Sequence, residues 1–134
     1  MAWLSRFQPY LLSILRIVAG LLFLEHGMQK ILHFPPMPAA MMAAIPPAFL
    51  PVIMAAGFIE LIGGALITVG AFTRIAAFVC SGEMAIAYWL VHFARGGFFP
   101  ALNGGDAAIL FCFVFLFIAA AGPGPIALSR SDRL

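Results

Sequence analysis

Near its C-terminus the chain carries the uninterrupted apolar run Ala107-Ala108-Ile109-Leu110-Phe111-Cys112-Phe113-Val114-Phe115-Leu116-Phe117. The strands of a membrane barrel alternate polar and apolar residues, and this run does not alternate. Extended to residues 106–122, the run reaches the range of about 17–25 mostly apolar residues that a helix needs to cross a bilayer. It therefore predicts a transmembrane helix.

Three earlier segments have the same character, at residues 11–32, 52–70 and 75–94. The chain of 134 residues is 64% hydrophobic and 9% charged, whereas a soluble domain carries about 25% charged residues. Lipid must therefore cover much of the surface. We expect an all-α fold in which residues 1–134 form a single domain, an integral membrane four-helix bundle.

The distribution of charge indicates an orientation and excludes one class of partner. The net charge of +2 is small and its Lys and Arg residues are scattered, so we do not expect nucleic-acid binding. Positive residues stay in the cytoplasm. Four spans place most cations on the side of the two termini, which should therefore be cytoplasmic, in a bacterial inner (plasma) membrane. That side carries Arg6, Arg16, Arg74, Arg130 and Arg133, and the other side carries Lys30 and Arg95.

The first outer loop, residues 33–51, has no charged side chain and is rich in proline and methionine. Residues 39–45 are long enough for two helical turns, with Pro38 as a permitted starter. We expect a short interfacial helix, which either packs over the bundle as a plug or acts as an entry gate for an apolar molecule. Cys80 and Cys112 should lie at depths about 13 Å apart, so we expect two free thiols.

Glu60 lies near the centre of the second apolar segment, where an ionisable side chain costs at least about 2.5–3.5 kcal/mol. It shares a helix face with Gly63 and Gly64, which would let a neighbouring helix approach closely. The outer half of the bundle should hold further polar groups. The candidate ligand-binding residues are Glu60, His26, Lys30, His92, Glu25 and Arg95.

Other polar groups have structural interpretations. Arg16 and Glu83 are expected at similar depth in the inner half, where they could pair, and Arg16 could also reach the cytoplasm as a topology anchor. Glu60 and Glu83 could serve packing alone. Asn103 and Asp106 most simply cap the fourth helix. A haem between His26 and His92, or a Glu/His metal site, has little support, so we expect no metal.

Short motifs run through almost the whole chain in a fixed order. They are Arg16 and Gly20, His26-Gly27-x-x-Lys30, Glu60-x-x-Gly63-Gly64, Gly70-x-x-Thr73-Arg74, Met84, Ala87, His92, Asn103-Gly104-Gly105-Asp106 and Gly122-Pro123-Gly124-Pro125-x-x-Leu128-Ser129. Taken together they resemble the DoxX family of small four-helix membrane proteins. The resemblance implies a membrane partner in thiol or sulfur oxidation, and one related branch looks like a subunit of thiosulfate:quinone oxidoreductase. It assigns no catalytic residue.

Three functions remain open. The chain could be a redox-associated subunit that binds a quinone-like molecule, with Glu60 relaying a proton. It could be a structural membrane partner whose polar groups hold helices together, or, less readily, a dimeric proton-coupled transporter. A complete enzyme is not expected because nucleotide and metalloprotease motifs are absent from the sequence, so an oxidoreductase subunit is the nearest enzymatic role. We expect the partners to be the bilayer and either further copies of the chain or a redox protein.

Overall fold

The computed structural model describes residues 2–129, which form helices, turns and no β-strand. The long elements are α2 (Gln8–Ile31), α4 (Leu50–Val69), α5 (Thr73–Ala87) with its continuations η2 (Tyr88–Phe93) and α6 (Ala94–Gly96), and α8 (Asp106–Ala121). The short elements are α1 (Ala2–Ser5), α3 (Ala39–Ala43), η1 (Pro47–Phe49) and α7 (Pro100–Asn103). Arg130 and Arg133, which entered the orientation argument, lie outside the described residues.

Three stretches are long and apolar enough to cross a bilayer: Gln8–Ile31, Pro47–Val69 and Thr73–Gly96. The fourth predicted span forms α8, an apolar helix that is shorter, at 16 residues. All four predicted segments are helical, but only three are long enough to cross a bilayer, so a fourth crossing by α8 stays a prediction.

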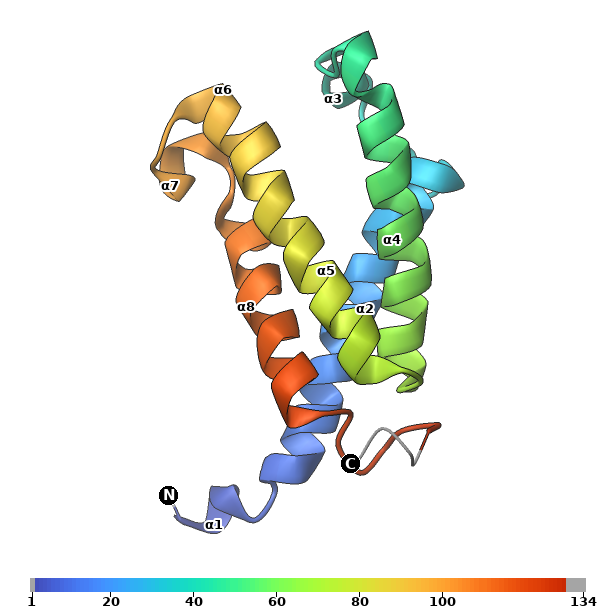
Figure 1. The fold of residues 1–134 in the computed structure, drawn as a ribbon, viewed down its shortest axis with the longest axis vertical. Coiled ribbons are helices and arrows are strands. Elements are labelled where there is room, and N and C mark those ends of the chain that lie inside the picture. The colour runs from blue at the N-terminus through green and yellow to red at the C-terminus, as the bar shows by residue number, and fades with distance from the viewer. Residues whose placement is uncertain (1, 130–134) are drawn as a thin grey trace.

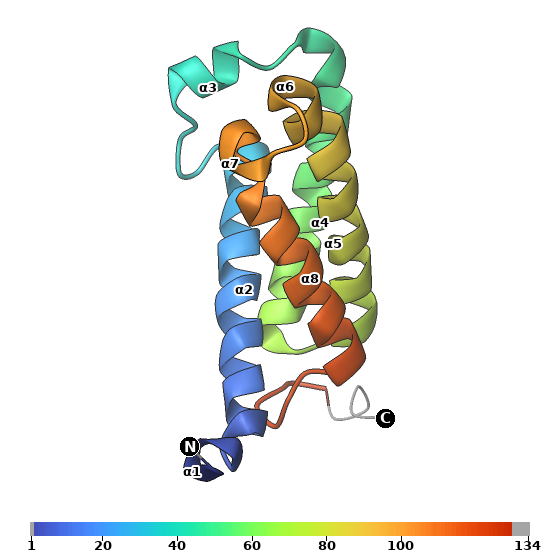
Figure 2. The same ribbon diagram turned by 90° about the vertical axis from the view of Figure 1, so that its left-hand side faces the viewer.

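The long helices form two antiparallel pairs (Figures 1 and 2). One pair is α2 with α4 and the other is α5 with α8, and α4 packs on α5 to join the pairs. α2 and α8 touch at few positions. The first turn of α2 and the C-terminal end of α8 lie at one end of the bundle, whereas α3, α6 and α7 lie at the other (Figure 1). We call these the terminal end and the loop end.

A three-residue turn at the terminal end explains why α4 and α5 are antiparallel neighbours. Gly70 has φ 76°, a left-handed conformation that glycine adopts without steric cost. The N–H groups of Gly70 and Ala71 both bond to the carbonyl of Leu66, at 3.0 Å each, so the last turn of α4 is closed as the chain reverses.

Glycines bring α2 and α4 into close contact. Gly20 and Gly27 on α2, and Gly57 and Gly64 on α4, are each seven residues apart and line the same seam. A Cβ atom at Gly20 would lie 2.6 Å from Thr68 Oγ1, and one at Gly64 would lie 2.5 Å from the Leu24 nitrogen. Small residues at such a seam let helix backbones approach in a membrane. The sequence pattern indicated a close approach at Gly64 and gave no sign of one at Gly57.

Aromatic rings fill the space between the pairs. The Phe23 ring on α2 lies 4.8 Å from that of Phe115 and 5.6 Å from that of Phe111, both on α8. Phe23 and Phe115 are fully buried. This cluster bridges α2 and α8.

The loop at residues 33–51 contains the short helix that its sequence predicted. α3 begins after Pro38 and ends at Ala43, two residues before the predicted limit. Its contact with a membrane interface remains a prediction. Cys80 and Cys112 are both free, as predicted.

Candidate functional site

The structure joins two of the predicted site residues, Lys30 on α2 and Glu60 on α4. The Lys30 Nζ donates to Glu60 Oε1 at 2.5 Å and also to Oε2. The side chain of Glu60 is 3% exposed and that of Lys30 is 20% exposed. A buried carboxylate with a bonded ammonium at its side is the arrangement that such a group needs inside a membrane.

The glycine seam creates this ion pair. Gly27 packs against the α4 backbone at Glu60 and Leu61, and a Cβ atom at Gly57 would lie 2.8 Å from Lys30 Cβ. The aliphatic part of Lys30 therefore lies directly along α4, and its ammonium reaches the carboxylate one turn further along that helix. The ion pair depends on glycines from both helices, and the sequence pattern of one helix does not show how the glycines of two helices meet.

Glu83 on α5 is the third member of the cluster. It interacts electrostatically with both Glu60 and Lys30. Both of its carboxylate oxygens are buried, and neither has a hydrogen-bond partner among the described residues. The expected pair of Arg16 and Glu83 is therefore wrong, because Glu83 faces the loop-end half of α4 rather than the position of Arg16.

Arg16 is instead a fully buried structural residue, 1% exposed. Its guanidinium donates to four backbone carbonyls, those of Ile67, Thr68, Pro123 and Ile126. A planar guanidinium with five N–H donors suits such a set of acceptors. Arg16 therefore ties the segment after α8 to the C-terminal end of α4, and it does not extend to the aqueous phase.

His92 belongs to a second polar group at the loop end. Its Nδ1 lies 3.2 Å from the carbonyl of Asn103, whose side-chain amide donates to Gly97 at 2.8 Å. The hydroxyl of Tyr88 donates to the carbonyl of Phe98 at 2.6 Å. These bonds hold the third loop rather than the ion pair. Residues Tyr88–Phe93 form a π-helical turn, an irregularity that accommodates this loop above α5.

The predicted cap of the fourth helix is partly correct. α8 begins at Asp106, which places a carboxylate in its first turn, where the helix dipole favours negative charge. The side-chain oxygen of Asn103 accepts from the Gly105 N–H at 2.7 Å, so Asn103 closes the turn before the helix and makes no cap bond to it.

The other candidates are not joined to the ion pair. Glu25, His26 and Arg95 are exposed side chains. His26 Nδ1 lies 2.7 Å from the carbonyl of Leu22, and its ring lies 6.3 Å from that of Phe111. Within residues 2–129, no group of three or more His, Cys, Asp or Glu side chains is arranged to hold a metal ion.

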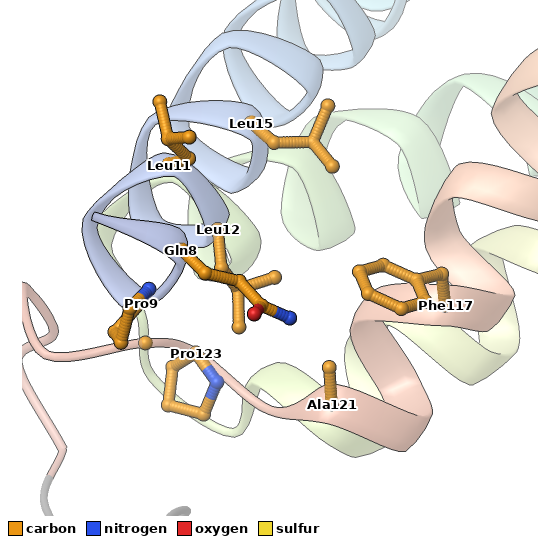
Figure 3. Close-up of a pocket in the computed structure, with 9 residues that line it drawn as sticks. Gln8, Pro9, Leu11, Leu12, Leu15, Phe117, Ala121 and Pro123 are labelled. Atoms are coloured by element: carbon orange, nitrogen blue, oxygen red, sulfur yellow. The ribbon is translucent and has the colours of Figure 1, made fainter. Parts of the chain in front are cut away.

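The structure has two apolar grooves that the sequence did not predict, and neither Lys30 nor Glu60 lines them. One, of about 610 Å³, is at the terminal end between the start of α2 and the end of α8. The amide of Gln8 points into it and faces Phe117 (Figure 3). The other, of about 320 Å³, lies between α4 and α5 and is lined in part by Gly63 and Cys80.

Comparison with known proteins adds a family and a relative. The DoxX family model matches residues 11–93, more than half of the chain. A protein of Haemophilus influenzae, described as an uncharacterized protein, is 42% identical over 129 residues, which are 95% of this chain and 94% of the relative. No solved structure matches the chain.

Proposed function

Because the chain belongs to the DoxX family and has apolar helices long enough to cross a bilayer, we propose that it is a membrane subunit or partner of a quinone-linked redox system. Its ligand site is the cluster of Lys30, Glu60 and Glu83. One observation carries this proposal: a buried ion pair lies beside a buried carboxylate that has no hydrogen-bond partner among the described residues.

The chemistry of the cluster suits a carbonyl-bearing ligand. An ammonium has three N–H donors, and the two bonds from Lys30 to Glu60 leave one for a ligand oxygen. The partial exposure of Lys30, 20%, supports access to it. A quinone has carbonyl oxygens that accept such a bond and an apolar body that prefers the bilayer.

The proposed topology has four spans in the bacterial inner membrane, with both termini in the cytoplasm. It is supported by the position of α1 and the end of α8 at one end of the bundle (Figure 1). α8 is about 24 Å long at 1.5 Å per residue, so residues on either side of it would complete the crossing. In this topology α3 lies at the outer interface, as a gate or as a plug.

The proposed site is tested by measuring whether the Glu60→Gln variant still binds the ligand. Native mass spectrometry of protein extracted with its own lipids should retain a quinone-sized adduct in the wild type and lose it in Glu60→Gln and Lys30→Gln. Glu25→Gln is the matched control, because Glu25 is exposed on α2 and has no place in the cluster. Retention of the adduct by Glu60→Gln at wild-type thermal stability would remove the proposed site.

A structural role for the ion pair is the second candidate. The observation in its favour is that Lys30 and Glu60 join α2 to α4 across the glycine seam. This role predicts that Glu60→Gln lowers the melting temperature and causes no separate loss of ligand binding or partner activity. A loss of either at unchanged stability would decide for the ligand site.

A further inference from the structure

We propose that Glu83 holds a proton in the resting protein, so that the cluster of Lys30, Glu60 and Glu83 is electrically neutral and presents a carboxylic acid O–H to its ligand. The sequence suggested Glu60 as the proton-carrying group, and the structure favours Glu83. The ligand part of this inference rests on the proposed function, whereas the protonation of Glu83 does not.

Helix register places the two carboxylates opposite each other. A Cβ atom at Gly63 of α4 would collide with the Cys80 sulfur of α5, so these positions mark where the helices touch. Glu60 precedes Gly63 by three residues, and Glu83 follows Cys80 by three. Because α4 and α5 are antiparallel, both carboxylates lie one turn from this contact in the same direction, toward the loop end.

The charges that face Glu83 do not balance if it is ionised. α2 contributes Lys30 and α4 contributes Glu60, and both interact with Glu83. α5 itself contributes the thiol of Cys80. α8 meets a different side of α5, where the sulfur of Cys112 lies 3.6 Å from the Ser81 hydroxyl. Among the described residues, one ammonium therefore faces two carboxylates.

Glu60 already uses the ammonium. Both of its oxygens accept hydrogen bonds from Lys30, whereas neither oxygen of Glu83 accepts any from the described residues. An isolated ionised carboxylate in an apolar interior is so costly that such a group becomes neutral instead. A proton on Glu83 removes the unbalanced charge and leaves the Lys30–Glu60 pair intact.

The protonation of Glu83 defines the chemical class of the ligand. A neutral cluster does not attract an ion, but it offers two donors, the Glu83 O–H and the remaining Lys30 N–H. A neutral apolar molecule with a carbonyl oxygen can accept from either donor. A cationic ligand would require an ionised Glu83, and an anionic ligand would lie against Glu60.

Infrared spectroscopy of the protein in lipid vesicles tests the proton directly. A protonated carboxyl buried in the bundle gives a carbonyl stretching band that shifts in deuterium oxide. We expect this band in the wild type at neutral pH, its loss in Glu83→Gln and its retention in Glu25→Gln. Because Gln is neutral and nearly isosteric, Glu83→Gln should keep the wild-type melting temperature.

Three results would overturn the proposal. The first is that the wild type lacks the band. The second is that the band is lost in Glu25→Gln but kept in Glu83→Gln. The third is that sodium, at constant ionic strength, raises the melting temperature of the wild type but not that of Glu83→Gln. The last result would assign a bound cation to Glu83. Quinone retention is measured on the same samples, so a wild type with the band and no retained quinone would refute the proposed function and leave the protonation of Glu83 standing.

Discussion

Replacing Arg16 by methionine should destabilise the protein strongly, although Arg16 lies away from the proposed site. Methionine keeps the apolar stem and removes the donors to four carbonyls. The acceptors at Ile67 and Pro123 are in buried bonds, and a buried carbonyl left without a donor costs about 1–3 kcal/mol. Membrane-protein hydrogen bonds average about 0.6 kcal/mol, which sets the lower limit near 2 kcal/mol for four bonds. We therefore expect Arg16→Met to lower the free energy of unfolding by about 2–5 kcal/mol.

The assay is equilibrium unfolding in mixed micelles with increasing SDS, followed by circular dichroism. Arg6→Met is the matched control, because Arg6 is exposed and its guanidinium lies over the Phe7 ring at 4.8 Å. That change should cost less than about 0.5 kcal/mol. Hydrogen exchange gives a local measurement: the Leu128 amide, bonded to Val69 at 3.0 Å, should exchange faster in Arg16→Met.

A loss below about 0.5 kcal/mol for Arg16→Met, equal to that of the control, would refute this reasoning. It would mean that water or rearranged backbone satisfies the carbonyls without the guanidinium. Faster exchange at Leu128 with no loss of global stability would confine the role of Arg16 to holding the segment after α8.

The seam, the ion pair and the third loop each give a further prediction. In the same assay, Gly27→Ala should lower the free energy of unfolding by at least about 2 kcal/mol, because its Cβ atom would collide with the α4 backbone. Gly82→Ala is the control: it has open space around it and should be neutral or stabilising by up to about 1 kcal/mol. Equal effects would show that the glycine seam does not hold the helices. A double-mutant cycle of Lys30→Met and Glu60→Met should give a coupling energy of about 1–3 kcal/mol, and the double variant should be more stable than Lys30→Met alone. Additive losses of stability would argue against a buried ion pair. Tyr88→Phe should cost about 1 kcal/mol and raise hydrogen exchange in residues 97–105, and unchanged exchange there would mean that its hydroxyl does not hold the loop.

The sequence predicted those features that depend on one helix at a time. Long apolar runs located the four helices, and Pro38 located the start of the short helix in the first loop. The cost of a charge in hydrocarbon was enough to single out Glu60 before its partner was known. These signals are local, because backbone hydrogen bonding within a membrane must be satisfied inside each segment.

The predictions from sequence were wrong where the contacts of one residue come from two other elements of the fold. Arg16 was expected to pair with Glu83 or to reach the cytoplasm, yet its acceptors are carbonyls at the end of α4 and in the segment after α8, more than 50 residues away along the chain. Backbone carbonyls have no sequence signature, so no pattern could have indicated them. The exposure of Glu25 and His26 also follows from which side of α2 meets α4.

The sequence by itself therefore determined a membrane protein of apolar helices with an ionisable group at its centre. The tertiary structure alone decided which charges meet. Glycines seven residues apart on α2 and α4 set the distance between these helices, and that distance brings Lys30 to Glu60. The register of α5 against α4 then places Glu83 beside the pair, where no described residue donates to it. Such contacts depend on packing between helices, which the periodicity of a single helix does not specify.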